Sequence, residues 1–402
     1  MAQTNKKSSF GPGFLVAAAF IGPGTVTTCT LAGANFGFAL LFSLLFAVLT
    51  TLILQEMTGR LSLASGKDLG RSLREYPQHR WTQILFILLT ISSITIGCAA
   101  YEAGNIIGGS LGLEMITGIP QKIWVVFISL VAAVLLRQQK YRIVERFLIV
   151  LVFLMSASFL ATAIIMSPDV GAVLRGFLPS FPENSLFLVL ALVGTTVVPY
   201  NLFLHSSAVR EKWRSIESLK DVRKDLVLAI SLGGLISVSI VITSAMAFYA
   251  RGIAVESGAQ MASQLQPLFG SVANALFGIG FFAAGMSSAV TAPYAAAFAS
   301  SGVLGWPEGQ KSQRFRMVWL GVILAGLTVS LFNFSPIAVI VFAQVTNGLV
   351  LPVASIFLLI VLNSRRILGE AVNSWKQNIL GGAIVAIVSL LGLWNIFRLL
   401  LQ

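Results

Sequence analysis

The chain has 402 residues, of which 56% are hydrophobic and only 10% are charged, and its mean hydropathy is +0.87. A soluble domain carries roughly 25% charged residues, so this composition excludes a cytosolic enzyme. The 27 lysines and arginines outnumber the 15 acidic residues, but they lie in short clusters between apolar runs. That placement is typical of a membrane topology signal and argues against nucleic acid as a partner.

Long runs without charge predict membrane-spanning helices. No Lys, Arg, Asp or Glu occurs from Ser8 to Gln55, and a bilayer core needs only about 20 apolar residues per helix, so that run holds two spans. We expect an all-α polytopic membrane protein whose single membrane-embedded domain covers residues 1–402. Eleven spans are predicted, at about 13–37, 39–58, 82–111, 121–136, 146–167, 185–208, 226–250, 269–302, 317–333, 336–362 and 378–397.

The basic residues predict the orientation, because cytoplasmic loops carry the excess of Lys and Arg. With the N-terminus inside, the tail and inner loops, with Arg60 counted among them, hold 23 of the 27 basic residues. The outer side then holds Lys122, Arg175, Arg251 and Arg398. We therefore expect a cytoplasmic tail over 1–12 and a C-terminus outside. A bacterial plasma (inner) membrane is the simplest location, with membrane lipid as a partner and the oligomeric state left open.

Two predicted spans carry backbone breakers near their middle. The first contains Gly22-Pro23-Gly24, and the sixth contains Val198-Pro199. An isolated proline usually only kinks a membrane helix, but these breaks occupy corresponding positions of a five-plus-five arrangement. That pairing predicts a transporter with two inverted repeats and a site between discontinuous helices, where unpaired carbonyls face a cation. The repeats would cover about 13–167 and 185–362, with an extra helix at about 378–397.

Two ionisable side chains fall deep inside predicted spans. Glu102 is the only charged residue between Arg80 and Glu114, and His205 lies in the otherwise uncharged sixth span. A charge at the bilayer centre costs about 2.5–3.5 kcal/mol on insertion scales, so such residues are functional by default. The alternatives are a neutral acid bonded to a neighbouring helix and a histidine that only packs.

Several strings of residues resemble one known family. They are Gly11-Pro12-Gly13 and Ile21-Gly22-Pro23-Gly24-Thr25 in the first span, Ser65-Gly66-Lys67-Asp68-Leu69 after the second, and Pro199-Tyr200-Asn201-Leu202-Phe203-Leu204-His205-Ser206-Ser207 in the sixth. Gly285-Met286-Ser287-Ser288, Gln344 and Leu351-Pro352 also fit. The chain is therefore similar to the Nramp (natural resistance-associated macrophage protein) transporters over nearly its whole length. The resemblance implies a leucine-transporter-like fold, alternating access and proton-coupled uptake of divalent metals.

The resemblance also locates the binding groups. The family's metal site takes Asp and Asn from the first break, and Met and His from the sixth span. Here these positions are Gly22, Thr25, Val198 and Tyr200, so no side-chain ligand of the usual type remains. Neutral oxygen and amide groups remain, from Thr25, Thr195, Tyr200 and Asn201, and Gln344 joins them as a candidate. Glu102 and His205 match residues of the family's proton route.

These residues leave three functions open. The first is import of a divalent cation with protons, although the missing thioether makes transition-metal selectivity doubtful. The second is the same scaffold moving another solute, such as an alkali cation or a small neutral or zwitterionic molecule, because neutral oxygens compensate a dication poorly. The third is a sensor or a subunit that does not transport; it is the least expected, because no soluble domain that could signal is predicted. No phosphate loop, nucleophile elbow or zinc-protease pattern occurs, so neither an enzyme nor a cofactor is expected.

Overall fold

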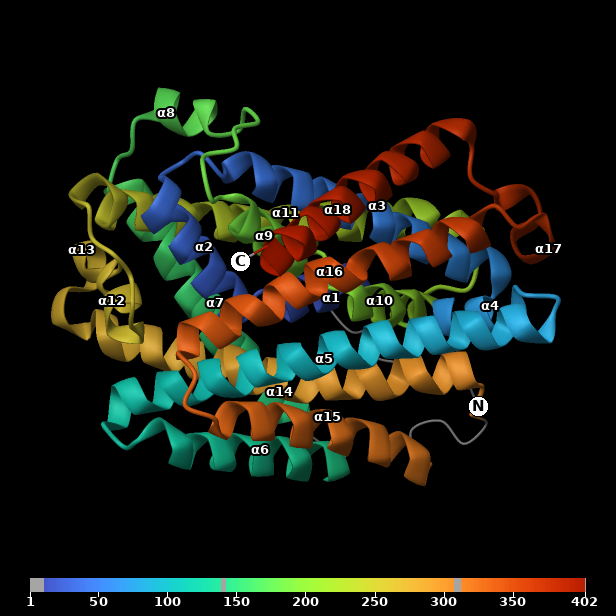
Figure 1. The fold of residues 1–402 in the computed structure, drawn as a ribbon, viewed down its shortest axis with the longest axis horizontal. Coiled ribbons are helices and arrows are strands. Elements are labelled where there is room, and N and C mark those ends of the chain that lie inside the picture. The colour runs from blue at the N-terminus through green and yellow to red at the C-terminus, as the bar shows by residue number, and fades with distance from the viewer. Residues whose placement is uncertain (1–10, 139–141, 307–311, 402) are drawn as a thin grey trace, which may run out of the picture.

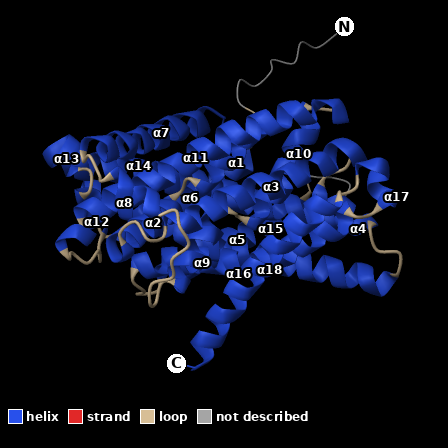
Figure 2. Cartoon of the chain, turned by 90° about the horizontal axis from the view of Figure 1, so that it is seen from above, coloured by secondary structure: helices blue, strands red, loops and turns tan. Residues whose placement is uncertain are grey.

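The computed structural model describes residues 11–138, 142–306 and 312–401. The predicted cytoplasmic tail therefore lies almost entirely outside the described residues. Over these ranges the chain is helical and contains no strand (Figure 2). Ten helices are long and apolar enough to cross a membrane, and α1 (Pro12–Phe20) with α2 (Pro23–Phe36) forms a bent pair that gives an eleventh span. The prediction of a polytopic all-α protein is confirmed.

The spans lie close to their predicted positions. After the bent pair, the spanning elements are α3 (Leu41–Ser65), α5 (Arg80–Thr117), α6 (Gln121–Gln138), α7 (Arg142–Ile165), α9 (Leu186–Thr196) with α10 (Pro199–Lys212), α11 (Leu219–Ala247), α14 (Ala273–Leu304), α15 (Gln313–Leu331), α16 (Pro336–Leu362) and α18 (Trp375–Leu401). Short helices lie in the connections: α4 (Leu69–Glu75), α8 (Val170–Arg175), α12 (Gly258–Ser263), α13 (Gln266–Phe269) and α17 (Arg365–Leu368), with the 3₁₀ turns Ile216–Ser218, Tyr249–Arg251, Gly270–Val272 and Gly369–Ala371.

One expected loop residue lies inside a helix. The sequence predicts Arg60 in an inner loop, but α3 continues past it to Ser65 and ends only where Gly66 adopts a left-handed conformation with φ +67°. Arg60 is buried. Its guanidinium bonds to the carbonyl of Ala371 and the side chain of Asn373, and it lies 3.8 Å from Glu56. A charge with this many partners can be buried, and an apolar window does not detect it.

Helix α5 lies at the centre of one side of the bundle. It runs beside α14, α15 and α16, and α6 lies beside α15 at the edge (Figure 1). Glycines let α5 and α14 approach closely: a Cβ on Gly285 would lie 2.4 Å from the backbone nitrogen of Gly109, and one on Gly112 would lie 2.5 Å from the carbonyl oxygen of Gly278. Small residues commonly bring membrane helices together in this way.

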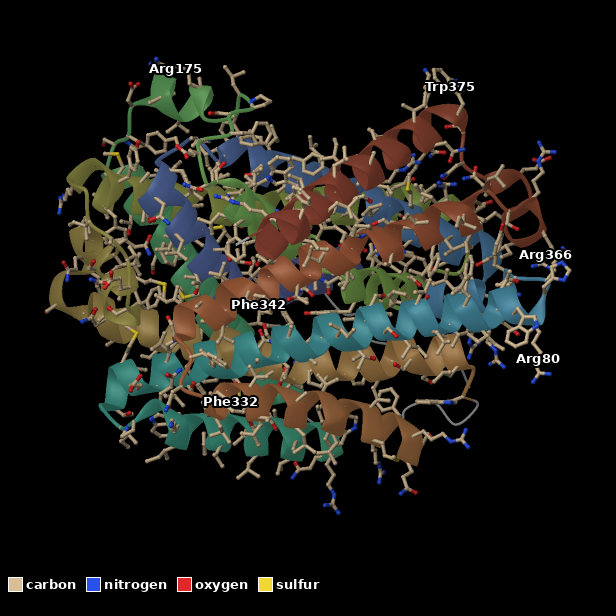
Figure 3. The ribbon with its side chains drawn as sticks, in the orientation of Figure 1. Arg80, Arg175, Phe332, Phe342, Arg366 and Trp375 are labelled. Carbon is tan, nitrogen blue, oxygen red and sulfur yellow. The ribbon has the colours of Figure 1, made fainter. Side chains whose placement is uncertain are left out.

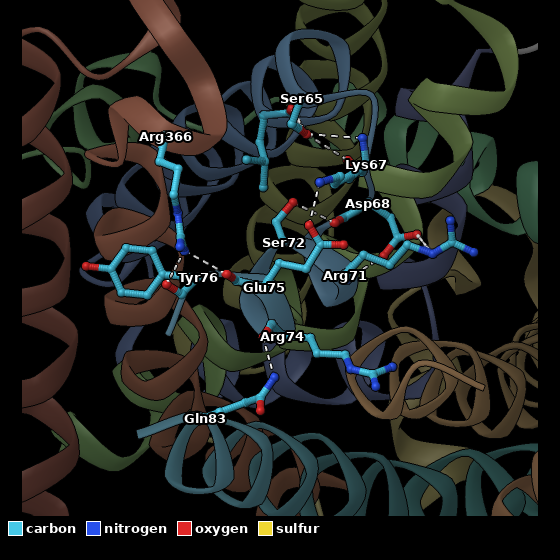
Figure 4. A network of polar contacts seen from close by, with 11 residues as sticks. Ser65, Lys67, Asp68, Arg71, Ser72, Arg74, Glu75, Tyr76, Gln83 and Arg366 are labelled. Atoms are coloured by element: carbon cyan, nitrogen blue, oxygen red, sulfur yellow. Dashed lines mark hydrogen bonds and ion pairs between the residues drawn. The ribbon is translucent and has the colours of Figure 1, made fainter. Parts of the chain in front are cut away.

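The two ends of the bundle differ in the residues that they carry. Arg80 and Arg366 lie at one end and Arg175 at the opposite end (Figure 3). At the first end Arg366 of α17 donates through Nη2 to the carbonyls of Glu75, at 2.7 Å, and Tyr76, at 2.5 Å, and Lys67 pairs with Glu75 (Figure 4). The two contacts of Arg366 tie the end of α4 to the segment that follows α16.

Candidate functional site

The two broken spans meet at their breaks. Helix α1 ends at Phe20 and α2 begins at Pro23, while α9 ends at Thr196 and α10 begins at Pro199. In both, proline occupies the first helical turn, where its missing N–H costs nothing. The Oγ1 atoms of Thr25 and Thr195 are 2.8 Å apart. Thr25 also donates to the carbonyl of Phe20, so Thr195 donates the hydrogen bond between the two hydroxyls.

Gln344 of α16 contacts both broken spans. A Cβ on Gly24 of α2 would lie 2.2 Å from its Nε2 atom, and a Cβ on Gly194 of α9 would lie 2.0 Å from its backbone carbonyl oxygen. The Nε2 atom donates to the carbonyl of Ile340 at 3.2 Å. Its Oε1 atom is buried and has no hydrogen-bond partner among the described residues. The structure therefore brings Gln344 together with both breaks, and one acceptor remains for a ligand or water.

The start of α10 holds further buried polar groups. Tyr200 and Asn201 are each 1% exposed. Within the described part of the chain, neither amide atom of Asn201 has a hydrogen-bond partner, and the Tyr200 hydroxyl interacts with Tyr101 but makes no hydrogen bond of ordinary geometry. Buried polar groups are nearly always satisfied, so these atoms are candidates to bind a ligand or ordered water. Val198 contributes only an extended backbone before the helix, with φ −76° and ψ 122°.

Two site residues were missed by the sequence analysis. A Cβ on Gly22 would lie 3.1 Å from Ser288 Oγ of α14 and 3.6 Å from the Tyr101 hydroxyl of α5. Tyr101 donates to the carbonyl of Ala19 at 3.4 Å, and its ring packs edge-on against Tyr200 with centroids 5.8 Å apart. Ser288 belongs to a string noted for its resemblance, but no local pattern places it or Tyr101 opposite a break.

The site is formed by neutral groups. Its polar atoms come from hydroxyls, amides and backbone carbonyls, and within residues 11–138, 142–306 and 312–401 no cluster of three or more His, Cys, Asp or Glu could hold a metal. Hydroxyl and carbonyl oxygens are hard ligands that suit hard cations better than soft ones. The arrangement can hold a cation by oxygen ligands or a small polar solute by hydrogen bonds.

Glu102 lies beside this site but faces another helix. It is fully buried, and a Cβ on Gly326 of α15 would lie 2.6 Å from its Cγ atom. Neither carboxyl oxygen has a hydrogen bond of ordinary geometry in the described structure, although Asn105, one helical turn onward, interacts with the carboxyl. Glu102 is also near enough to Tyr200 for an electrostatic interaction. The acid is therefore close to the breaks without lining them.

His205 faces a different helix, α3. Its Nδ1 atom is 3.0 Å from Thr58 Oγ1, and Thr58 also donates to the carbonyl of Gln55 at 2.9 Å. The Nε2 atom is buried and has no partner among the described residues. No hydrogen bond joins His205 to Glu102 in this part of the chain, so a proton route through both would need intervening groups or water.

The candidate site is closed on both sides. Thr25, Thr195 and Gln344 are each at most 1% exposed. A separate cavity of about 1040 Å³ lies beyond it, lined mostly by apolar side chains of α2, α9 and α16, among them Leu31, Phe187 and Phe342. None of the candidate binding residues lines that cavity. The structure therefore holds the site in an occluded arrangement.

The chain is similar to known membrane transporters. Residues 13–398 match the family model described as natural resistance-associated macrophage protein-like. A divalent metal cation transporter MntH of Nostoc is 33% identical, with 94% of this chain and 88% of the relative covered. The same-named protein of Brucella suis is 30% identical, with 97% and 88% covered.

Solved structures share the fold. A crystal structure of a mutant of the manganese transporter of Eremococcus coleocola superposes with a TM-score of 0.79 at 21% identity, covering 96% of this chain and 85% of that chain. MhsT in complex with L-phenylalanine gives a TM-score of 0.61 at 17% identity, covering 94% and 98%. These matches confirm the predicted leucine-transporter-like fold.

Proposed function

The chain belongs to the Nramp family, and from that membership we propose that it is a secondary transporter that imports a divalent metal cation together with protons. It is a transporter and not an enzyme. Its relatives MntH of Nostoc and of Brucella suis are named as divalent metal cation transporters. The observation that supports the proposal most directly is the pair of Thr25 and Thr195 hydroxyls, 2.8 Å apart where the two broken helices meet.

In the proposed site, the cation is held by neutral oxygens. Thr25, Thr195 and Asn201 provide side-chain groups, Gln344 provides Oε1, and carbonyls at the ends of α1 and α9 provide partial negative charge. The positions of the family's usual ligands are Gly22, Thr25, Val198 and Tyr200. A hydrated magnesium ion suits such a set, since Mg²⁺ keeps several waters. Selectivity for soft transition metals is doubtful without a thioether.

Glu102 and His205 are proposed to couple transport to protons. Both are fully buried in spans, and each has buried polar atoms without a hydrogen bond of ordinary geometry in the described structure. Glu102 balances charge near Tyr200 on the α15 side, and His205 acts with Thr58 on the α3 side. Because they face different helices, we assign them to separate steps and not to one direct transfer.

We also propose how the chain is oriented in the membrane. The protein is a multi-pass membrane protein, and its MntH relatives favour the cytoplasmic membrane of a bacterium. We assign the N-terminus to the cytoplasm, the C-terminus to the outside, and the two repeats to about 13–167 and 185–362. The repeats would move relative to each other and open the closed site to one side at a time.

Uptake into proteoliposomes tests the function. Manganese and magnesium are each offered outside with an inward proton gradient, and protein-free vesicles serve as the control. We expect saturable uptake of at least one ion with acidification of the lumen. Absence of uptake of both ions by folded protein would contradict the proposal and favour the second candidate, another solute on the same scaffold. The neutral side chains at the breaks are the observation behind that alternative.

A single substitution tests the role of the missing thioether. Val198→Met restores a soft ligand at the start of α10, so we expect cadmium uptake to rise relative to magnesium uptake by about tenfold or more. Val193→Met, one turn before the break in α9 and equally buried, is the matched control. An unchanged cadmium-to-magnesium ratio in Val198→Met would contradict the assignment of Val198 to the ion site.

A further inference from the structure

The start of α1 is held by a carboxylate of another helix. The backbone nitrogen of Gly13 donates to Asp225 Oδ2 of α11 at 2.6 Å. A Cβ on Gly11 would lie 1.7 Å from Asp225 Oδ1, and one on Gly13 would lie 2.8 Å from the Asp225 carbonyl oxygen. A side chain at either position would displace the carboxylate or the backbone of α11. Gly11 and Gly13, which flank Pro12, therefore leave the space that the Asp225 carboxylate occupies.

The electrostatics of this contact are favourable. The first N–H groups of a helix have no partner within the helix, and the N-terminal end carries partial positive charge. Pro12 has no N–H, so Gly13 offers the first available donor, and an acidic side chain is the preferred partner. Asp225 is only partly exposed, which limits screening of the interaction by solvent.

The beginning of α11 is itself anchored. Arg223, two residues before Asp225, contacts Glu56 Oε1 of α3 through Nη2 at 2.6 Å and through Nε at 3.0 Å. Glu56 also lies 3.8 Å from the buried Arg60. The first turns of α11 therefore connect the start of α1 to α3, the helix whose Thr58 contacts His205.

The other end of α1 reaches the candidate site. The carbonyl of Ala19 accepts from Tyr101, and that of Phe20 accepts from Thr25. The helix has nine residues and is bent by 57° from α2. It is a short rigid segment with Asp225 at one end and the binding groups at the other. A contact that fixes its first turn also fixes the position of its last carbonyls.

We propose that Asp225 is a positioning residue for transport, which latches α1 onto α11 through Gly11 and Gly13 and stabilises the closed state of the site. Loss of the latch releases the first turn of α1 and opens the site at the end of the bundle that carries α4. The inference rests on the proposed transport function, because only a transporter needs this helix to move. A ligand or substitution shifts such an equilibrium only by its differential effect on the two states.

Thiol labelling at a buried position of α1 tests the latch. Ala17→Cys places a reporter on α1 at a position that is 6% exposed, and the native Cys29 and Cys98 are buried. We expect Asp225→Ala to increase the labelling rate of this reporter by roughly five- to thirtyfold, as for any contact whose loss shifts a two-state equilibrium by one to two kcal/mol. Asp221→Ala, which removes an exposed acid one turn earlier in α11, is the matched control and should leave the rate unchanged.

A second reporter separates release of α1 from general loosening. Ala34→Cys lies on α2, beyond the break, and is also 6% exposed. Its labelling rate should not change in Asp225→Ala. Equal rates in Asp225→Ala and Asp221→Ala at position 17, or equal increases at both reporters, would overturn the proposal. If Asp225→Ala does not fold, Asp225→Asn is compared with Asp221→Asn by the same criterion.

The labelling needs no transported ion. Faster labelling in Asp225→Ala, in a protein that takes up neither manganese nor magnesium, would support the latch and contradict the proposed function. Uptake of metal with unchanged labelling would support the function and contradict the latch. The two hypotheses therefore fail separately.

Discussion

The hydroxyls of Thr25 and Thr195 lie 2.8 Å apart although 170 positions separate them in the chain. Thr25 is in the first turn of α2 and Thr195 is in the last turn of α9. The contact therefore joins the second piece of one broken span, α2, to the first piece of the other, α9. It places two hydroxyls beside the carbonyl ends that a cation would use.

Replacing either threonine with valine should impair uptake. Thr25→Val and Thr195→Val keep the shape of the side chain but remove the oxygen, so each should lower uptake efficiency by about tenfold. Because the hydroxyls bond to each other, the double variant should lose less than the product of the two effects. Thr346→Val, which changes a partly exposed threonine of α16 that lies outside the site, is the control. Fully multiplicative losses in the ion-uptake assay would contradict a shared site.

Gly194→Ala should destabilise the protein. The new Cβ would lie 2.0 Å from the Gln344 carbonyl oxygen and 2.6 Å from the Gly348 nitrogen. Both are backbone atoms that cannot rotate away, so we expect a loss of about 1–3 kcal/mol or more and a lower Tm in detergent. Gly321→Ala in α15 meets nothing within 4 Å and should be neutral or stabilising by up to about 1 kcal/mol. Equal Tm values for the two variants would refute the close approach of α9 and α16.

Glu102→Gln should uncouple transport from protons. The amide has almost the same size as the carboxyl but cannot bind or release a proton near neutral pH. We expect metal uptake to lose its dependence on an imposed proton gradient, with acidification of the lumen reduced at least tenfold. Glu217→Gln, at an exposed glutamate, is the control. Gradient-dependent uptake of wild-type magnitude in Glu102→Gln would exclude Glu102 from the coupling.

His205→Ala should change the dependence of uptake on pH. Histidine is the side chain that most readily changes charge near neutral pH, and His205 is bonded to Thr58 at 3.0 Å. His205 is fully buried in this structure, so a proton would reach it only as the site opens during transport, and we expect His205→Ala to flatten the pH profile of uptake between about pH 5 and 8. The chain contains only one other histidine, the exposed His79, so His79→Ala is a direct control. If both variants retain the wild-type profile, His205 serves only in packing.

The sequence predicted much of this architecture because its signals are local. Apolar runs reveal which segments enter the bilayer, and Pro23 and Pro199 reveal where two of them break, since proline disrupts a helix wherever it occurs. The charge-free environment of Glu102 likewise marked it as unusual. Each of these inferences needs only neighbouring residues in the chain.

Only the tertiary structure decided which faces of the spans meet. Most of these helices are apolar on all sides, so their sequence carries little information about which face contacts which neighbour. That is why the sequence could not show that Glu102 of α5 faces α15, that His205 of α10 faces α3, or that Tyr101 and Ser288 lie opposite Gly22. The contact of Asp225 with Gly11 and Gly13 likewise joins two helices whose contacting residues are more than 200 positions apart in the chain. The sequence determined the spans and their breaks, and the packing of one span against another decided what each break faces.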